Sequence, residues 1–118
     1  MVSMVLSAAV MAAGEELRSD LMQEIEDANK SLSSNIALSN KPASTTDARE
    51  LTRMFAEVEQ HFEKKGDATN AVDLARQSRQ LATDIVGLVD KGDFAAASTA
   101  STNLSRTCRT CHTFYKKE

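Results

Sequence analysis

The chain has 118 residues, which is enough for one domain with a modest core. Glycine occurs four times, proline occurs once, and aromatic residues make up only 4% of the sequence. This composition favours an all-helical fold. The net charge of −3 is mild and gives no sign of a nucleic-acid partner.

The first segment, residues 1–13, is uncharged and ends in small residues before Gly14-Glu15-Glu16. An apolar run of this length is typical of a secretory signal, with cleavage after Ala12 or Ala13. It is too short for a transmembrane helix, so no membrane span is expected. We interpret 1–13 as the remnant of a signal whose basic start is missing, and 14–118 as the domain. An apolar extension of the first helix is the alternative.

The first helix is expected from Gly14 to Ser39, because apolar residues recur there at spacings of three and four. Pro42 disfavours helical backbone at the preceding residue, so 39–44 is expected to form a turn. The apolar stripe of this helix consists of Leu17, Leu21, Ile25, Ala28, Leu32 and Ile36.

The second helix is expected to begin at Thr46 or Asp47, where Asp47 and Glu50 resemble a capping pair. It is expected to end at Gly66, since glycine commonly closes a helix. Its apolar stripe consists of Leu51, Phe55, Val58 and Phe62.

The third helix is expected from Asp67 to Lys91, and the fourth from its cap, Asp93, to about Lys116. Their stripes are Ala71, Leu74, Ser78, Leu81, Ile85 and Leu88, and then Phe94, Ala97, Leu104, Cys108, Cys111 and Tyr115. Four amphipathic helices with short links predict an all-α, antiparallel up-down-up-down four-helix bundle.

The last helix carries Cys108-Arg109-Thr110-Cys111-His112, the C-x-x-C-H run in which c-type haem is attached. Each thiol forms a thioether to the porphyrin, and the histidine binds the iron from one face. On a helix, Cys108, Cys111 and His112 share one face. A redox dithiol, a zinc site and a coincidental motif are weaker alternatives, since both cysteines lie here and strand signals are missing.

The other face of the iron has two candidate ligands, Met22 and His61. In the expected bundle, both lie at about the height of His112, whereas Met54 lies roughly 10 Å from His61 along the axis. Met22 borders the stripe of the first helix, and His61 lies off the stripe of the second. Core packing for Met22 and surface exposure for His61 are the ordinary alternatives.

The chain resembles the class II c-type cytochromes, the group that includes cytochrome c prime, over residues 15–118. Leu17–Met22 is similar to the first-helix segment of that family, Lys91–Phe94 to the turn before its last helix, and Cys108–Lys117 to its haem segment. The segment between the second and third helices is shorter here than in typical members.

The resemblance implies one covalent haem c at one end of the core, with His112 and Met22 as axial ligands of the iron. It also places Arg18 near a haem propionate, although an ion pair with Asp20 or Glu15 would serve equally well. An iron bound on both faces suits one-electron transfer and no enzymatic chemistry. The alternative is a five-coordinate, gas-binding protein similar to cytochrome c prime, for nitric oxide or carbon monoxide.

The same resemblance implies export, so the expected location is the periplasm of a bacterium. Expected partners are redox proteins, acidic ones if basic residues at the haem end steer docking, and a second copy of the chain in a homodimer. In the alternative interpretation, these basic residues only stabilise the C-terminal ends of their helices by complementing the helix dipole. They are Lys64, Lys65, Arg106, Arg109, Lys116 and Lys117.

Overall fold

The computed structural model describes residues 20–66 and 69–115, and for residues 111–115 it describes the backbone alone. This part of the chain contains four helices and no strand. The helices are α2 (Leu21–Ala37), α3 (Lys41–Lys65), α4 (Thr69–Asp90) and α5 (Phe94–Tyr115). The all-α prediction is therefore confirmed.

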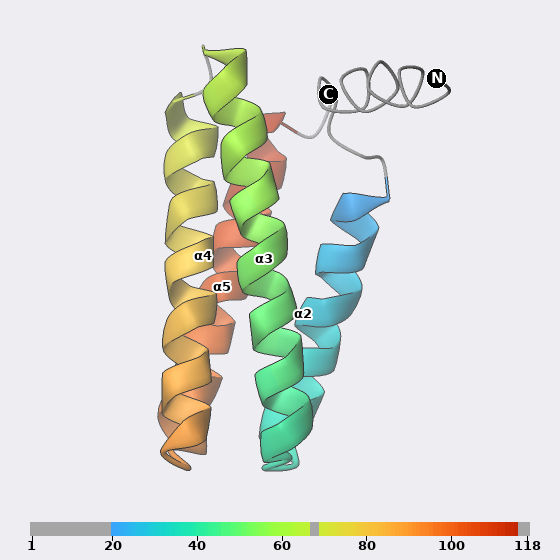
Figure 1. Ribbon diagram of the computed structural model, residues 1–118, viewed down its shortest axis with the longest axis vertical. Helices are drawn as coiled ribbons and strands as arrows, with labels where there is room; N and C mark the ends of the chain where they lie inside the picture. The colour runs from blue at the N-terminus through green and yellow to red at the C-terminus, as the bar shows by residue number, and fades with distance from the viewer. Residues whose placement is uncertain (1–19, 67–68, 116–118) are drawn as a thin grey trace, which may run out of the picture.

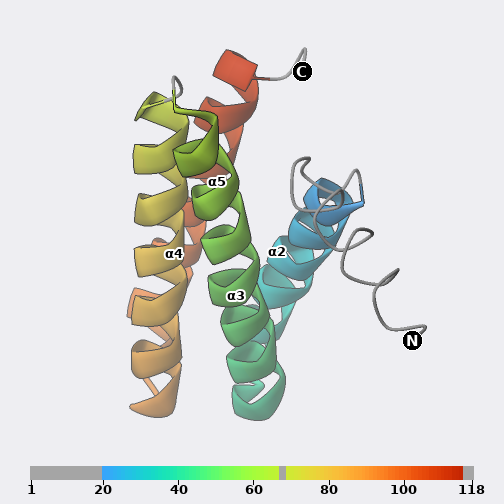
Figure 2. The ribbon, with the colours of Figure 1, turned by 45° about the horizontal axis from the view of Figure 1, so that its top comes forward.

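The helices form an antiparallel bundle in which α2 and α4 each pack against α3 and α5 (Figure 1). The start of α2 and the end of α5 consequently lie at one end of the bundle, as the up-down-up-down topology predicts. Toward this end α2 leans away from the other three helices (Figures 1 and 2). The bundle is thus tightest at the turn between α2 and α3 and widest where α2 begins.

All four helices contribute to the core, which includes most of the predicted stripes of α2 and α3; the prediction for α4 needs a correction. Leu21, Leu32 and Leu51 are fully buried, as expected from their spacing. On α4, however, Leu74, Leu81 and Leu88 are only half-buried, so the predicted stripe is displaced around the helix axis. Small side chains fill much of the buried face of α4, which consists of Ala71, Ala75, Ser78, Ala82, Ile85 and Val89.

The start of α3 differs from the prediction, because the helix begins at Lys41 and not near Thr46. Asn40 is the N-cap, and its side-chain oxygen accepts a hydrogen bond from the Ala43 backbone nitrogen at 3.2 Å. Pro42 lies in the first turn, where its missing N–H has no helical partner to lose. The proline therefore begins a helix where we expected it to prevent one.

Asp47 consequently lies inside α3 and does not cap it. Its carboxylate Oδ2 accepts hydrogen bonds from Ser31 Oγ at 2.7 Å and from Asn35 Nδ2 at 2.8 Å. Both donors belong to α2, so this carboxylate links the first two helices near their turn.

The helix expected from Gly14 begins at Leu21, after its N-cap Asp20, so its predicted start is wrong. The predicted helix boundaries at Gly66 and Asp93 are confirmed. Gly66 closes α3 in the left-handed conformation, with a φ of 85° that favours glycine. Asp93 caps α5, and its Oδ1 accepts a hydrogen bond from the Ala96 backbone nitrogen at 3.1 Å.

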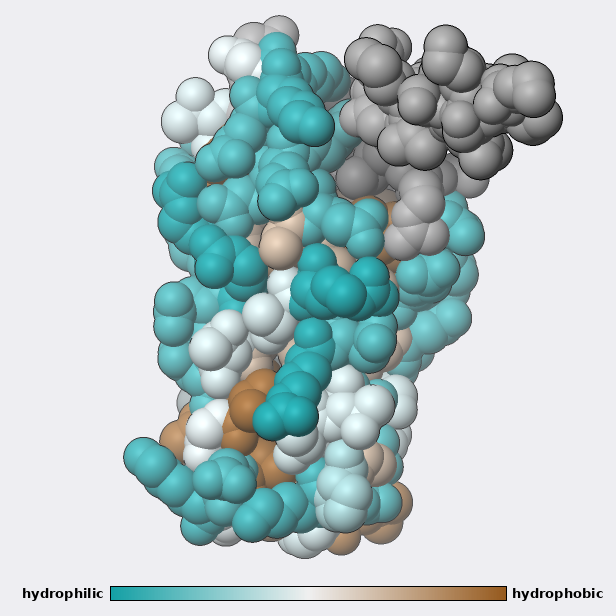
Figure 3. Space-filling view, viewed as in Figure 1, coloured by the Kyte–Doolittle hydropathy of each residue, from teal (hydrophilic) through white to brown (hydrophobic). Residues whose placement is uncertain are grey.

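The surface formed by α3 and α4 is mostly hydrophilic, with a short hydrophobic strip toward the end away from the start of α2 (Figure 3). Among large hydrophobic residues in the described ranges, Leu38 is highly exposed, at 74%. No helix in this part of the chain is long and apolar enough to cross a membrane, in agreement with the sequence.

On the surface of α3, hydrogen bonding to Glu50 raises the pKa of Arg53.

Candidate haem-binding site

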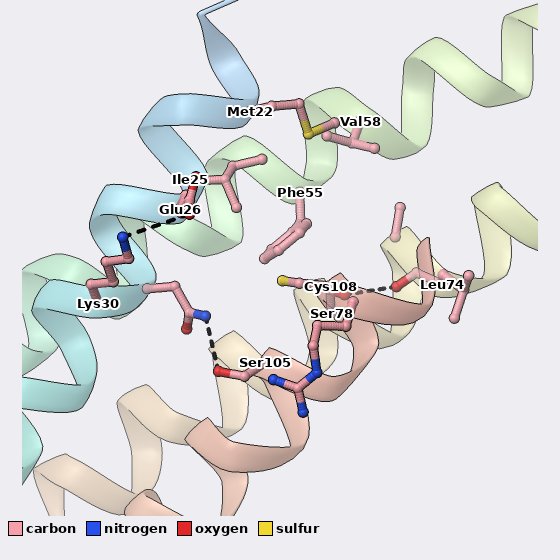
Figure 4. A pocket seen from close by; sticks show the side chains of 13 residues that line it. Met22, Ile25, Glu26, Lys30, Phe55, Val58, Leu74, Ser78, Ser105 and Cys108 are labelled. Carbon is pink, nitrogen blue, oxygen red and sulfur yellow. Dashed lines mark hydrogen bonds and ion pairs between the residues drawn. The ribbon is translucent and has the colours of Figure 1, made fainter. Parts of the chain in front are cut away.

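A cavity of about 290 Å³ lies between the four helices and is partly open to solvent (Figure 4). This volume is close to the lower limit of roughly 300 Å³ for typical ligand pockets. Its walls are mainly apolar, with polar groups contributed by α2, α4 and α5. The lining residues include Met22, Ile25, Asn29, Phe55, Val58, Leu74, Ala75, Ser78, Ser105 and Cys108.

The α2 wall of the cavity follows from helical spacing. Met22, Ile25 and Asn29 recur three and four residues apart, so they share the face that α2 turns toward α5. Met22 is half-buried and packs against the core, and its side chain points toward Val58 of α3 (Figure 4). At the rim, Lys30 forms an exposed ion pair with Glu26 at 3.6 Å.

The α5 wall contributes Cys108, which is half-buried and packs against the core cluster. Its sulfur points into the cavity (Figure 4). Met22 and Cys108 thus line the same cavity from the first and last described helices. The structure therefore brings together two of the residues that the sequence suggested for one site.

Of the other predicted site residues, one is not described and two are placed by their backbone alone. Arg18 lies outside the described residues, as does the segment 1–13. Cys111 and His112 belong to α5, but their side chains lie outside the description. Their backbone positions follow Cys108 by three and four residues, which is about one helical turn along the axis.

The competing ligand His61 does not line this cavity. It is half-exposed on α3, and its ring packs edge-on against Phe62 with the centroids 4.9 Å apart. Met54 is buried, at 2% exposure, but it does not line the cavity either. Of these three sulfur or imidazole side chains, Met22 alone faces the cavity that contains Cys108.

Sequence reasoning missed a second set of residues, the hydrogen-bonded polar pairs between α2 and α5. Asn29 Nδ2 donates to Ser105 Oγ at 3.0 Å, and the hydroxyls of Ser33 and Ser101 lie 3.2 Å apart. The pairs are four residues apart on each helix. This repeat of small polar residues was the available signal, but it points to a contact only once the helix pairing is known.

The cavity combines mainly apolar walls with two sulfur-bearing side chains, Met22 and Cys108. No group of three or more His, Cys, Asp or Glu side chains is clustered in the part of the chain that the structure describes. Soft sulfur atoms from Met22 and Cys108 face apolar walls instead, and thioether sulfur is an established ligand of haem iron. Asn29 Oδ1 is buried at the wall without a hydrogen-bond partner, so one acceptor there is available to a donor in the cavity.

No protein-family model, no curated protein and no solved structure significantly matches the chain. Two features of the chain itself bear on its function, namely the C-x-x-C-H run and the cavity that Met22 and Cys108 share.

Proposed function

We propose that this protein transfers single electrons by means of one haem c, as the class II c-type cytochromes that it resembles do. Cys108 and Cys111 would hold the haem through thioethers, and His112 and Met22 would bind its iron. The single observation that carries the proposal is that Met22 and Cys108 line one cavity although they are distant in the sequence. Arg18 near a propionate remains an expectation of the resemblance.

The hydrogen bonds between α2 and α5 support the pairing of Met22 with His112. Asn29 pairs with Ser105, and Met22 lies seven residues before Asn29 while His112 lies seven residues after Ser105. The two helices are antiparallel, so equal steps in opposite directions along the chain reach the same height. Seven residues are about two helical turns, which also returns each position to the same face.

The walls of the cavity suit electron transfer. Bound haem supplies an iron that changes its charge by one. Ile25, Phe55 and Val58 form an apolar wall on the α2 and α3 side, and apolar surroundings favour the less charged state of the iron and raise its reduction potential. Met22 and His112 would be held on helices, so they would move little when the charge on the iron changes, and with both bound the iron would have no position for a substrate.

The proposal is tested by intact mass under denaturing conditions. The chain is produced in the periplasm of a bacterial host with c-type haem-attachment enzymes. The expected product is heavier than the processed chain by one haem. Cys108→Ser and Cys111→Ser each remove one thioether, and the double variant should carry no covalent haem. Protein that never gains this mass would overturn the proposal.

Carbon monoxide distinguishes the electron carrier from the gas-binding alternative. With Met22 on the iron, the reduced protein should bind carbon monoxide weakly, because the ligand must first displace the sulfur. Rapid and tight binding to the unmodified protein would instead indicate an open distal face.

Export and docking complete the proposal, because c-type haem is attached outside the cytoplasm in the cytochromes that the chain resembles. Lys64 and Lys65 at the end of α3, and Arg106 and Arg109 on α5, are exposed at the haem end. Such a cluster on an acidic protein would steer an acidic redox partner. Electron transfer to that partner should slow steeply as salt is added, and a flat dependence would contradict docking by charge.

A further inference from the structure

The contact between α2 and α5 contains two polar pairs in one register. Asn29 Nδ2 donates to Ser105 Oγ at 3.0 Å, and one turn further from the site the Ser33 and Ser101 hydroxyls share a hydrogen bond at 3.2 Å. Both pairs are partly buried. We call these two pairs the α2–α5 ladder.

The Asn29–Ser105 pair of the α2–α5 ladder is adjacent to the candidate site. Asn29 and Ser105 both line the cavity, together with Met22 and Cys108. Ser105 lies three residues before Cys108, and therefore on the same face of α5. A shift of either helix along the other would break this pair and would move Met22 relative to Cys108 by the same distance.

The position of α2 depends on such a link because α2 leans away from the bundle toward its start (Figures 1 and 2). Asn29, in the middle of α2, links this helix to α5 through its hydrogen bond to Ser105. Its Oδ1 is buried and has no partner, so the bond to Ser105 is the link that orients the amide. Without Ser105 Oγ, the side chain would lose the contact that fixes it against α5.

We propose that Asn29 and Ser105 are positioning residues for the Met22 ligand. Their hydrogen bond sets the height and separation of α2 on α5 and keeps the Met22 sulfur within reach of an iron bound at His112. This inference rests on the proposed haem function. It adds that binding of the Met22 sulfur to the iron depends on the Asn29–Ser105 pair, which lies about two helical turns from Met22.

The test compares the carbon monoxide affinity and the visible spectrum of reduced holoprotein variants. Asn29→Ala and Ser105→Ala remove the pair, and Ser105→Thr keeps the hydroxyl and should restore it. Asn35→Ala is the matched control, because Asn35 Nδ2 links α2 to Asp47 of α3 at 2.8 Å and lies outside the cavity. It removes the same kind of side chain and a similar helix link.

The two disrupting variants should bind carbon monoxide about fivefold more tightly than the unmodified protein, the factor expected when one ordinary hydrogen bond no longer favours the sulfur-bound state. Ser105→Thr and Asn35→Ala should bind it as the unmodified protein does. Equal affinities in all variants, or an equal change in Asn35→Ala, would overturn this inference and leave the proposed function intact. Unmodified protein without covalent haem would overturn both.

Discussion

Glu59 provides a test of how α3 and α4 are held together. Among the residues that the structure describes, it is the one charged residue that is buried, at 9% exposure. Its Oε1 accepts a hydrogen bond from Arg79 Nε at 2.9 Å, and its Oε2 accepts one from Arg76 Nε at 3.2 Å. Both arginines belong to α4, so one carboxylate of α3 fixes two turns of its neighbour.

The substitution Glu59→Gln keeps the size of the side chain but removes its charge and one acceptor. The new amide N–H₂ would face an arginine N–H, so one buried hydrogen bond would be replaced by two donors that face each other. A hydrogen bond to a charged group contributes about 1.5–3 kcal/mol. The Arg76 and Arg79 side chains are 52% and 36% exposed, and solvent screening reduces this value. We expect a loss of about 1.5–2 kcal/mol in the free energy of unfolding.

Urea unfolding followed by circular dichroism measures this loss, and the midpoint should fall by roughly 1 M for an ordinary dependence on denaturant. Glu63→Gln is the matched control, because Glu63 Oε2 lies 3.8 Å from Arg76 Nη2 and both side chains are 52% exposed. The control should change the free energy of unfolding by less than about 0.5 kcal/mol. Equal shifts in the two variants would refute the special role of the Glu59 carboxylate.

Three further stability predictions use the same unfolding measurement. Ser44→Ala should be neutral or stabilising by up to about 1 kcal/mol, because the buried Ser44 hydroxyl has no hydrogen-bond partner; a clear loss would reveal a missed contact. Leu51→Ala should cost about 2–5 kcal/mol at a fully buried position, whereas Leu38→Ala on the surface should change stability by less than about 0.5 kcal/mol. Pro42→Ala should lower stability by about 0.4–1 kcal/mol, since the first turn of α3 accepts proline; stabilisation would show that Pro42 strains the helix.

The fold could be predicted from the sequence because its helices are amphipathic and their links are short. Spacings of three and four identified the buried faces of α2 and α3, and Gly66 and Asp93 marked helix ends by their backbone chemistry. The errors arose where two readings of one residue competed. Pro42 fits a turn or a first helical turn, and on α4 alanine competes with leucine for the buried face because close helix packing favours small side chains.

The candidate site could be predicted from the sequence only in part. The C-x-x-C-H run depends on local spacing. Topology placed both Met22 and His61 at the height of His112, and the apolar stripe together with the resemblance favoured Met22. Asn29 and Ser105 could not be found this way, because a repeat of small polar residues on a helix does not show which helix lies opposite. Their role follows from the register between α2 and α5, which only the three-dimensional structure supplies.

The most direct test of the account is the visible spectrum of oxidised holoprotein carrying Met22→Leu, compared with Met54→Leu. Both changes nearly conserve volume, and Met54 is a buried methionine outside the cavity. We predict that the unmodified protein and Met54→Leu show the low-spin spectrum with a sulfur–iron charge-transfer band, and that Met22→Leu loses both. An unchanged spectrum in Met22→Leu would contradict the account and direct attention to His61 as the ligand.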